Sequence, residues 1–489
     1  MLLSRLLEKI EYSAVCPERE IFSVTNDSRS TNDGSIFVCI KGFKTDGHLF
    51  AMSAYERGCR VFICEYAIDL PNDATVICVP NARRALAILS SALYAEPSKE
   101  LIVIGITGTK GKTTTALMIK QLLDKSGIPT GYIGSNGVIL GDRKIETPNT
   151  TPESHILQRY LRDMADSGMR AAVMEISSQA LKLERVFGIK FDINLFTNFS
   201  PDHIGPDEHS DLEDYFFSKK KLFDDYGART VIANADDIMT DKILADCKSK
   251  KIYYSTDKTA FYMAKDLQLL ESANALGTRF VCFEGDEHFD CSLSVPGMFN
   301  VHNALAAIAV ARELDIERDK IVTALESMNI EGRFETLITP RGARFVIDYA
   351  HNGLSLKSAL LALREYNPNR LICLFGSVGG RTRLRRTQLG DVASEYADFS
   401  ILTSDNPDTE EPMSVINDIA KCFENEKSYI AIPDRAKAIR YAYNMAEDGD
   451  IILLAGKGHE KYQLICGKKL PFCEHDILID LINKIQTMK

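Results

Sequence analysis

The amino-acid sequence predicts an α/β protein of three domains, and three observations carry this prediction. The chain has 489 residues, which is too long for one hydrophobic core and corresponds to about three domains of ordinary size. In two separate regions, short apolar strands alternate with helical stretches, a pattern typical of a parallel sheet covered by helices. A glycine-rich loop follows the first strand of the first such region. We therefore expect a small α/β domain, a P-loop domain with a central parallel sheet, and a C-terminal Rossmann-like domain.

The first domain is predicted over residues 1–98. It holds short β-like runs such as 35–40, with turn signals on either side. The segment 95–100 is polar and carries Pro97, which cannot continue a helix. We place the first domain boundary there.

The second domain is predicted over residues 99–332 and the third over residues 333–489. The boundary between them falls near Gly332, after a helical run that begins at Asn303. The predicted strands are 101–107, 171–176, 191–197 and 230–233 in the second domain, and 344–349, 370–375, 399–403 and 450–455 in the third.

The overall composition excludes several classes of protein. A formal net charge of −10 argues against a nucleic-acid partner, because proteins that bind nucleic acid concentrate Lys and Arg. Residues 1–10 interrupt their apolar side chains with charges, which predicts an amphipathic helix rather than a signal sequence. No apolar run approaches the roughly 20 residues that a membrane span needs. We expect a cytoplasmic monomer with no membrane or nucleic-acid partner.

The chain has 12 cysteines, and no two of them form a C-x-x-C pair. Several lie in apolar strand-like runs, among them Cys39, Cys64, Cys78 and Cys373. Thiols in such runs behave as small apolar side chains. We expect reduced, buried cysteines and neither a zinc site nor a disulfide framework.

The strongest chemical signal is the loop 105–113, which lies between a predicted strand and a predicted helix over 114–125. Its glycines let backbone N–H groups close on phosphate oxygens, Lys112 can reach the terminal phosphates, and Thr113 can bind magnesium. The loop departs from the usual P-loop spacing, because Ile106 stands where the first glycine is expected. The predicted nucleotide-binding residues of this loop are Gly108, Thr109, Lys110, Gly111, Lys112, Thr113 and Thr114.

Two further polar residues follow buried strands of the same domain. Glu175 ends one predicted strand, and His203 follows the next. A single such residue is more often a structural cap, but two of them after a phosphate loop predict metal ligands. A phosphate loop alone fits kinases, motor ATPases and ligases equally well.

Four segments in order, over two domains, resemble the Mur ligase family: 107–113, 174–178, 300–307 and 348–351. The resemblance covers nearly the whole chain and implies an ATP-dependent amide ligase that forms an acyl phosphate and uses magnesium. It implies ATP contacts at Asn300, Asn303, Arg333, Asp348 and His351, with the two asparagines near adenine. The last domain is expected to close over the nucleotide before reaction.

Within the family the chain resembles the type that adds the third residue of the peptidoglycan stem peptide. The partners implied are UDP-N-acetylmuramoyl-dipeptide and a free amino acid. Segments 27–29 and 46–48 resemble the part that holds the uridine. The implied substrate-binding residues are Ser28, Asn149, Thr150, Thr151, Ser177, Arg185, Arg381, Asp405, Asn406, Asp408, Gly456 and Glu460.

The resemblance also implies a modified lysine, an N6-carboxylysine at Lys219. A carbamate turns a cation into an oxygen ligand, the kind that magnesium prefers. The alternative, a solvated lysine on a helix face, fits Lys220 and Lys221 better. The resulting metal ligands are Thr113, Glu175, His203 and Lys219, and the catalytic residues are Lys112, Glu175, His203 and Lys219.

The incoming amino acid is predicted from Asp408. Members that use meso-diaminopimelate carry Arg at this position, which grips the distal carboxylate. A carboxylate there would attract a distal ammonium instead, so L-lysine is favoured, with ornithine as a related diamine. Against this, the segment 456–460 has the form common in diaminopimelate-adding members, and Arg381 could supply the missing cation. The alternatives are that the enzyme uses meso-diaminopimelate and that Asp408 points to solvent.

Two other functions remain possible at this point. A folylpolyglutamate synthetase has similar ATP chemistry but lacks the uridine-binding first domain. A P-loop kinase or regulatory nucleotide-binding protein would have no ligase activity. The cluster of Arg381, Arg383, Arg385 and Arg386 lacks stacking aromatics, so it favours an anionic substrate or solvent over RNA.

Overall fold

The structure of the chain is a computed structural model. It describes residues 1–12, 16–43, 45–202, 204–205, 208–271, 276–380 and 383–486. The chain divides into two compact units, one of Met1–Met263 with Leu305–Glu317 and the other of Ala264–Ala304 with Arg318–Lys489. The predicted three-domain boundaries, at residues 98 and 332, stay predictions.

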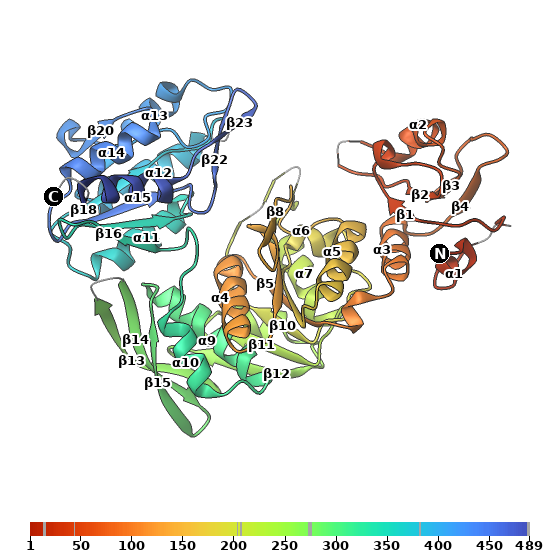
Figure 1. The fold of residues 1–489 in the computed structure, drawn as a ribbon, viewed down its shortest axis with the longest axis horizontal. Coiled ribbons are helices and arrows are strands. Elements are labelled where there is room, and N and C mark those ends of the chain that lie inside the picture. Colours follow the sequence, from red (N-terminus) through yellow and green to blue (C-terminus); the bar gives the residue numbers. More distant parts are fainter. Residues whose placement is uncertain are drawn as a thin grey trace. The chain divides into compact units, whose positions relative to one another are not determined.

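The first unit begins with a small parallel sheet in the order β1-β2-β3-β4 (Figure 1). Its strands are β1 Ser23–Thr25, β2 Ser35–Val38, β3 Val61–Cys64 and β4 Thr75–Cys78, with helices α1 Leu3–Leu7, α2 Ala51–Glu56 and α3 Ala82–Leu93. Neighbouring residues of a strand point to opposite faces. Ile36 packs into a cluster with Leu86 of α3, whereas Phe37 packs into a separate cluster with Phe62. The sheet is therefore covered on both faces.

A larger parallel sheet fills the rest of the first unit, in the order β12-β11-β10-β5-β9-β6, and the antiparallel strands β7 and β8 extend it. The strands are β5 Ile102–Thr107, β6 Thr130–Gly134, β7 Gly137–Leu140, β8 Arg143–Ile145, β9 Ala171–Glu175, β10 Ile193–Phe196, β11 Thr230–Asn234 and β12 Lys250–Ser255. The helices are α4 Lys112–Lys125, α5 Ser154–Asp166, α6 Ser178–Lys182, α7 Leu212–Asp224 and α8 Thr240–Ile243. The predicted parallel sheet is confirmed, and its central strands β5, β9 and β10 end beside the phosphate loop.

The second unit holds three long strands that the sequence analysis did not predict. They are β13 Tyr262–Glu271, β14 Leu276–Glu284 and β15 Glu287–Leu293, and β14 pairs with β15 in antiparallel register from Thr278–Leu293 to Glu284–Glu287. Alternating exposed and buried residues in β15 fit a sheet with one solvated face. Helices α9 Met298–Glu313 and α10 Arg318–Glu326 follow in the sequence.

The C-terminal sheet has the order β16-β17-β21-β18-β19-β20, with only β16 antiparallel. Its strands are β16 Glu335–Ile338, β17 Arg344–Asp348, β18 Leu371–Phe375, β19 Phe399–Leu402, β20 Tyr429–Ala431 and β21 Ile451–Ala455, followed by the hairpin β22 Tyr462–Ile465 and β23 Lys468–Pro471. The helices are α11 Gly353–Arg364, α12 Arg383–Tyr396, α13 Pro412–Ala420, α14 Arg435–Met445 and α15 Glu474–Gln486. The predicted Rossmann-like arrangement is confirmed; the hairpin was not predicted.

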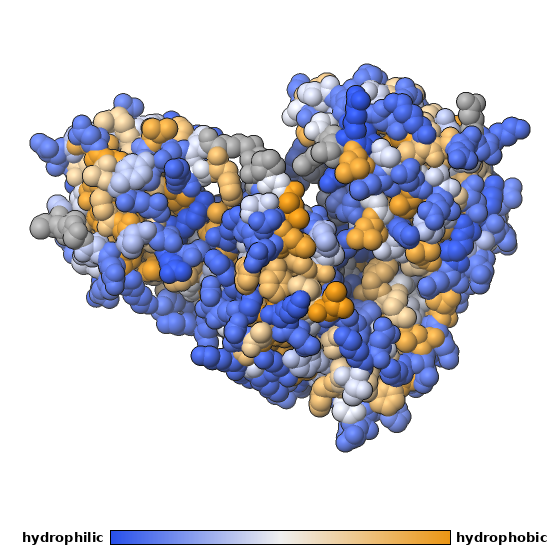
Figure 2. All heavy atoms as spheres, turned by 180° about the vertical axis from the view of Figure 1, so that it is seen from behind, coloured by the Kyte–Doolittle hydropathy of each residue, from blue (hydrophilic) through white to orange (hydrophobic). Residues whose placement is uncertain are grey.

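Polar residues cover most of the face drawn in Figure 2, and apolar residues appear there in scattered groups. Of the four cysteines named in the prediction, Cys39, Cys64 and Cys373 are buried, but Cys78 is exposed at the end of an edge strand. Cys466 is also exposed. Within the described residues, no helix combines the length and apolar character that a membrane crossing requires.

Candidate functional site

The phosphate loop joins β5 to α4 and needs glycine at both of its bends. Gly108 and Gly111 have φ of 150° and 83°, which favour glycine. A Cβ atom at Gly108 would collide with the Thr197 hydroxyl. The loop backbone is fixed by Asn198, whose Oδ1 accepts from the N–H of Lys110 at 2.8 Å. Helix α4 begins at Lys112, so its N-terminal N–H groups point into the loop.

Two predicted catalytic lysines meet at one carbonyl group. Lys112 Nζ donates to Gly108 O at 2.8 Å and Lys219 Nζ donates to the same oxygen at 2.7 Å. Lys219 is buried, and its Nζ lies 4.5 Å from the Tyr215 ring centre. Burial, together with the nearby Lys112 cation, holds the pKa of Lys219 well below its usual range. Lys220, by contrast, is ion-paired with Asp224 and Asp246.

Glu175 and Thr113, two predicted metal ligands, are in direct contact. The Thr113 hydroxyl donates to Glu175 Oε2 at 2.9 Å. Glu175 is fully buried, and its Oε1 accepts from Tyr132 and from the N–H of Ser135. Hard oxygen donors of this kind suit magnesium. Tyr132 and Ser135 were not predicted, because nothing in the sequence near β6 marks them as partners of a carboxylate that lies 43 and 40 residues further along the chain.

Three predicted substrate-binding residues lie together beside Glu175. Thr151 Oγ1 donates to the Glu175 carbonyl at 2.8 Å and accepts from the N–H of Ser177 at 3.0 Å. Arg185 donates to the Thr151 carbonyl at 3.1 Å and to Glu153 at 2.9 Å. Residues from β9, the loop before α5 and the end of α6 therefore form one cluster. Thr150 is partly exposed next to Ser135, and Asn149 is exposed.

Two other predicted residues, His203 and Arg381, lie outside the described residues. No group of three or more His, Cys, Asp or Glu side chains that could hold a metal is found in the part of the chain that the structure describes.

In the small sheet of the first unit, the predicted uridine segments are built around two capping carboxylates. Asp46 accepts from the N–H and Nδ1 of His48, at 3.0 and 2.6 Å, and from Tyr66 at 2.8 Å. The hydrogen bonds from His48 lower the pKa of Asp46 to about 2. His48 stacks on Tyr66 with ring centres 3.9 Å apart. Ser28 begins a short 3-10 helix capped by the Asp27 carboxylate.

The predicted ATP contacts of the second unit fall into two groups. Asn303 donates to Asn300 at 3.1 Å, and both are buried on α9. Asp348 ends β17 and accepts from the N–H groups of Phe334 and Ala350, while burial raises its pKa. Arg333 lies over the Tyr349 ring at 4.7 Å. His351 Nδ1 lies 2.8 Å from the Tyr349 carbonyl oxygen, and burial lowers its pKa.

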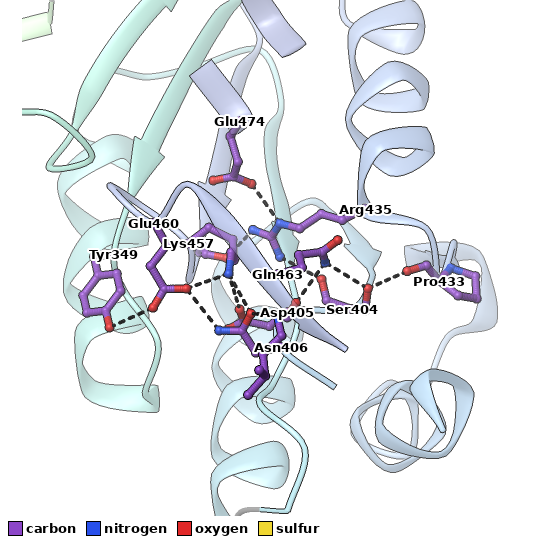
Figure 3. Close-up of polar contacts among 12 residues, drawn as sticks. Tyr349, Ser404, Asp405, Asn406, Pro433, Arg435, Lys457, Glu460, Gln463 and Glu474 are labelled. Atoms are coloured by element: carbon purple, nitrogen blue, oxygen red, sulfur yellow. Dashed lines mark hydrogen bonds and ion pairs between the residues drawn. The ribbon is translucent and has the colours of Figure 1, made fainter. Parts of the chain in front are cut away.

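Three of the predicted amino-acid-binding residues, Asp405, Asn406 and Glu460, lie together near the C-terminal ends of β19 and β21 (Figure 3). Asn406 Nδ2 donates to Glu460 Oε2 at 3.0 Å. Asp405 is buried, and a Cβ atom at Gly456 would lie 3.2 Å from its Oδ2. Gly456 has a φ of 111°, so both conformation and space favour glycine there.

A second layer of charged residues lies beneath this group and was missed by the sequence analysis. Lys457 donates to Asn406 at 2.8 Å and to Glu460 at 2.6 Å. Arg435 is paired with Glu474 at 2.8 Å, and both side chains are fully buried. Arg435 also donates to the carbonyls of Ser404 and Ala455, and Figure 3 shows it between Glu474 and Ser404. The sequence signal available for Lys457 was its place inside the segment 456–460, which was already predicted to bind the amino acid. No such signal marks Arg435 or Glu474.

Asp408, which was predicted to attract a distal ammonium, makes a contact that the sequence analysis did not predict. Its Oδ1 accepts from the N–H of Gly467 at 2.7 Å, in the turn of the β22–β23 hairpin. Its own N–H donates to the Leu464 carbonyl at 2.9 Å. Asp408 has a φ of 52°, a conformation that Asp and Asn tolerate better than most residues. One oxygen of the carboxylate thus holds the hairpin turn.

One member of the arginine cluster differs from its prediction. Arg386 is buried and pairs with Glu410 and Asp418, so it serves packing and not an anionic substrate or solvent. Arg383 is exposed and lies 3.8 Å from Asp418.

Comparisons with known proteins agree along the whole chain. Residues 20–97 match the Mur ligase family catalytic domain, residues 106–311 the Mur ligase middle domain, and residues 332–458 the Mur ligase glutamate ligase domain. The UDP-N-acetylmuramoyl-L-alanyl-D-glutamate–2,6-diaminopimelate ligase of Clostridium perfringens is 37% identical, over 99% of this chain and 100% of that protein. The protein of the same name from Caldanaerobacter subterraneus is 40% identical over 95% of each chain.

A solved structure of a ligase with this name superposes with a TM-score of 0.73 at 29% identity, covering 99% of this chain and 100% of that one. The predicted α/β fold is confirmed by this match. The relatives are diaminopimelate ligases, so the preference for L-lysine is not confirmed and the alternative is favoured.

Proposed function

Because the chain belongs to the Mur ligase family, and is therefore an ATP-dependent ligase of peptidoglycan-precursor synthesis, we propose that it joins meso-diaminopimelate to UDP-N-acetylmuramoyl-L-alanyl-D-glutamate. The observation that carries this proposal is the sequence similarity to diaminopimelate ligases, which extends over nearly the full length of the chain. The contact of Asp408 with Gly467 supports it, because one oxygen of this carboxylate is already used in the hairpin turn.

The proposed activation step takes place at the phosphate loop. The γ-phosphoryl group of ATP passes to the D-glutamate carboxylate, which gives an acyl phosphate with phosphate as a good leaving group. Lys112 and the N-terminus of α4 stabilise the charge on the phosphate oxygens. Thr151, Ser177 and Arg185 position the nucleotide-sugar peptide, since they form one cluster beside Glu175.

Thr113, Glu175, His203 and Lys219 would hold magnesium in this proposal. The contact between Thr113 and Glu175 supports the first two, because both present oxygen donors at one place. When bound, magnesium neutralises phosphate oxygens during transfer. His203 is proposed from the resemblance alone.

Lys219 is proposed to carry the carbamate. Its amine is buried beside the phosphate loop, and its lowered pKa increases the neutral form that attacks carbon dioxide. The new N–C bond forms as the amine loses a proton, and the carbamate oxygens then serve as ligands.

One amine of meso-diaminopimelate, in its neutral form, attacks the acyl carbon; phosphate leaves and the new amide nitrogen releases a proton. Asp405 and Glu460 bind the other, unreactive amino group as its ammonium in this proposal, because carboxylates from two loops meet there. Closure of the C-terminal domain would exclude the water that hydrolyses an acyl phosphate.

The ligase reaction is tested by phosphate release with the purified protein. Release should require ATP, the dipeptide nucleotide and meso-diaminopimelate together. Release with ATP and only one co-substrate at the full rate would indicate a simple phosphatase or kinase and contradict the proposal.

A further inference from the structure

Lys457 is the most enclosed cation near the proposed amino-acid site. It follows β21, its side chain has no exposed surface, and its Nζ lies 5.2 Å from the Tyr462 ring centre. Three oxygen atoms surround the ammonium: Asn406 Oδ1 at 2.8 Å, Glu460 Oε2 at 2.6 Å and Asp405 Oδ1 at 3.7 Å. These acceptors belong to the residues proposed to bind the amino acid, whereas Lys457 itself faces away from solvent.

Lys457 sets the orientation of the Asn406 amide. Asn406 Oδ1 accepts from both Lys457 and the N–H of Leu464, at 2.8 and 2.9 Å. The amide nitrogen must then point the other way, where it donates to Glu460 Oε2 at 3.0 Å. Lys457, Asn406 and Glu460 form a closed triangle (Figure 3).

This triangle occupies one carboxylate oxygen of Glu460 and leaves the other for a ligand. Oε2 accepts from Lys457 and Asn406. For Oε1, the contact within the described residues is the Tyr349 hydroxyl at 3.4 Å, the longest of the network. Asp405 Oδ1 is buried and accepts no hydrogen bond from the part of the chain that the structure describes. A buried acceptor without a donor is costly unless a ligand supplies one.

The charges lead to the same conclusion. Asp405 and Glu460 contribute two negative charges, and Lys457 contributes one positive charge. The group can therefore accept one further ammonium at little electrostatic cost. Without Lys457, the two carboxylates would repel each other, and Glu460 could turn toward solvent.

We propose that Lys457 is a positioning residue for the ligation, which holds Glu460 so that its Oε1 and the Asp405 carboxylate face the unreactive ammonium of the incoming amino acid. The inference rests on the proposed function, since it assigns the residue that orders its amino-acid site. It concerns the second amino group, which meso-diaminopimelate, L-lysine and ornithine all carry in addition to the one that reacts. It therefore holds for L-lysine as it does for meso-diaminopimelate.

The test compares the parent protein with Lys457→Met in steady-state ligation. The KM for meso-diaminopimelate should rise by about 10- to 100-fold, because a displaced binding carboxylate has effects of this size. The KM values for ATP and the dipeptide nucleotide should stay within about twofold. Lys461→Met is the matched control, because Lys461 is the nearby exposed lysine and pairs with Glu331. It should leave the KM for the amino acid unchanged.

A double-mutant cycle separates positioning from general packing. In a Glu460→Gln background, Lys457→Met should add little further loss, because Lys457 acts through Glu460. Equal losses in both backgrounds, or equal rises in all three KM values, would overturn the inference. If Lys457→Met does not fold, Lys457→Gln keeps a hydrogen-bond donor without the charge. An unchanged amino-acid KM in Lys457→Gln would overturn the inference as well.

The parent protein distinguishes a failure of this inference from a failure of the proposed function. If it prefers L-lysine, the proposed amino acid is wrong, and the same comparison is made with L-lysine. If it releases no phosphate with any amino acid, the proposed function fails and the inference falls with it.

Discussion

At the residue scale, Lys112 and Lys219 share the Gly108 carbonyl as acceptor but differ in their surroundings. Lys112 belongs to the loop itself and is partly exposed, whereas Lys219 reaches the loop from α7 and is buried. A cation suits the first place, where phosphate charge must be balanced. A neutral amine suits the second, because burial disfavours the charged form.

Lys219→Ala should lower kcat by at least about 100-fold, because it removes a proposed magnesium ligand beside the phosphate loop. Excess short carboxylates such as formate should restore part of the activity. The matched control is Lys220→Ala, next in sequence and paired with Asp224 and Asp246. It should retain most of the activity. Full activity of Lys219→Ala without additives would contradict the proposed carbamate, as would the absence of a carbamate signal in ¹³C NMR of parent protein incubated with labelled bicarbonate.

Substitutions at Asp408 separate its charge from its hydrogen bond. Asp408→Asn keeps an oxygen acceptor for Gly467 and tolerates the positive φ, whereas Asp408→Ala does neither. Thermal unfolding should therefore show a loss of about 1 kcal/mol for Ala and less for Asn. The ratio of rates with meso-diaminopimelate and L-lysine should be the same for Asn as for the parent. A shift of that ratio in Asp408→Asn would show that the charge does select the amino acid.

At the scale of elements, the buried pair of Arg435 and Glu474 joins the starts of α14 and α15. Arg435 also donates to carbonyls at the ends of β19 and β21, the strands whose loops carry the proposed amino-acid site. One guanidinium thereby fixes two loops relative to each other.

Arg435→Met should destabilise the protein by about 3–5 kcal/mol, because it leaves a buried carboxylate without its partner. The double variant Arg435→Met/Glu474→Leu should regain part of this stability. The control Arg364→Met breaks an exposed pair with Asp398 and should cost at most about 1 kcal/mol. Urea unfolding measures all three, and a single variant as stable as the parent would contradict the assigned role.

Helix α5 carries a pH-sensitive residue in its first turn. Burial lowers the pKa of His155 from 6.5 to about 4. Between these values the unfolded chain binds a proton that the folded chain does not, so stability falls as the pH falls from about 6.5 to about 4. His155→Gln should make the melting temperature less dependent on pH in this window. His288→Gln, at an exposed position, is the control. An unchanged pH dependence in His155→Gln would show that other groups dominate.

The elements that the sequence predicted best are the buried parallel strands. β5, β9, β11 and β18 are mostly apolar runs, and in each of them the structure shifts one end by one residue. β13 to β15 escaped prediction because their alternating polar residues do not form such runs.

At the scale of the whole molecule, local motifs were more informative than isolated residues. The phosphate loop and Glu175 could be predicted, because glycine spacing and strand ends are written in the sequence. Hydrogen bonds between residues from distant segments could not be predicted. Tyr132 reaches Glu175, and Gly467 occupies Asp408, only once the sheets and the hairpin have formed.

The preferred amino acid also could not be predicted from one isolated residue. The Asp408 charge suggested L-lysine, yet the fold uses this carboxylate in a turn, and the nearly full-length relatives are diaminopimelate ligases. The central claim, that the enzyme adds meso-diaminopimelate, therefore depends on similarity along the whole chain and not on one residue.

The most direct measurement is a competition experiment with purified protein, ATP, the dipeptide nucleotide and equal concentrations of meso-diaminopimelate and L-lysine. Mass spectrometry of the nucleotide product gives the ratio of the two kcat/KM values. We predict that meso-diaminopimelate is incorporated in clear excess. A product that carries mainly L-lysine would contradict the account.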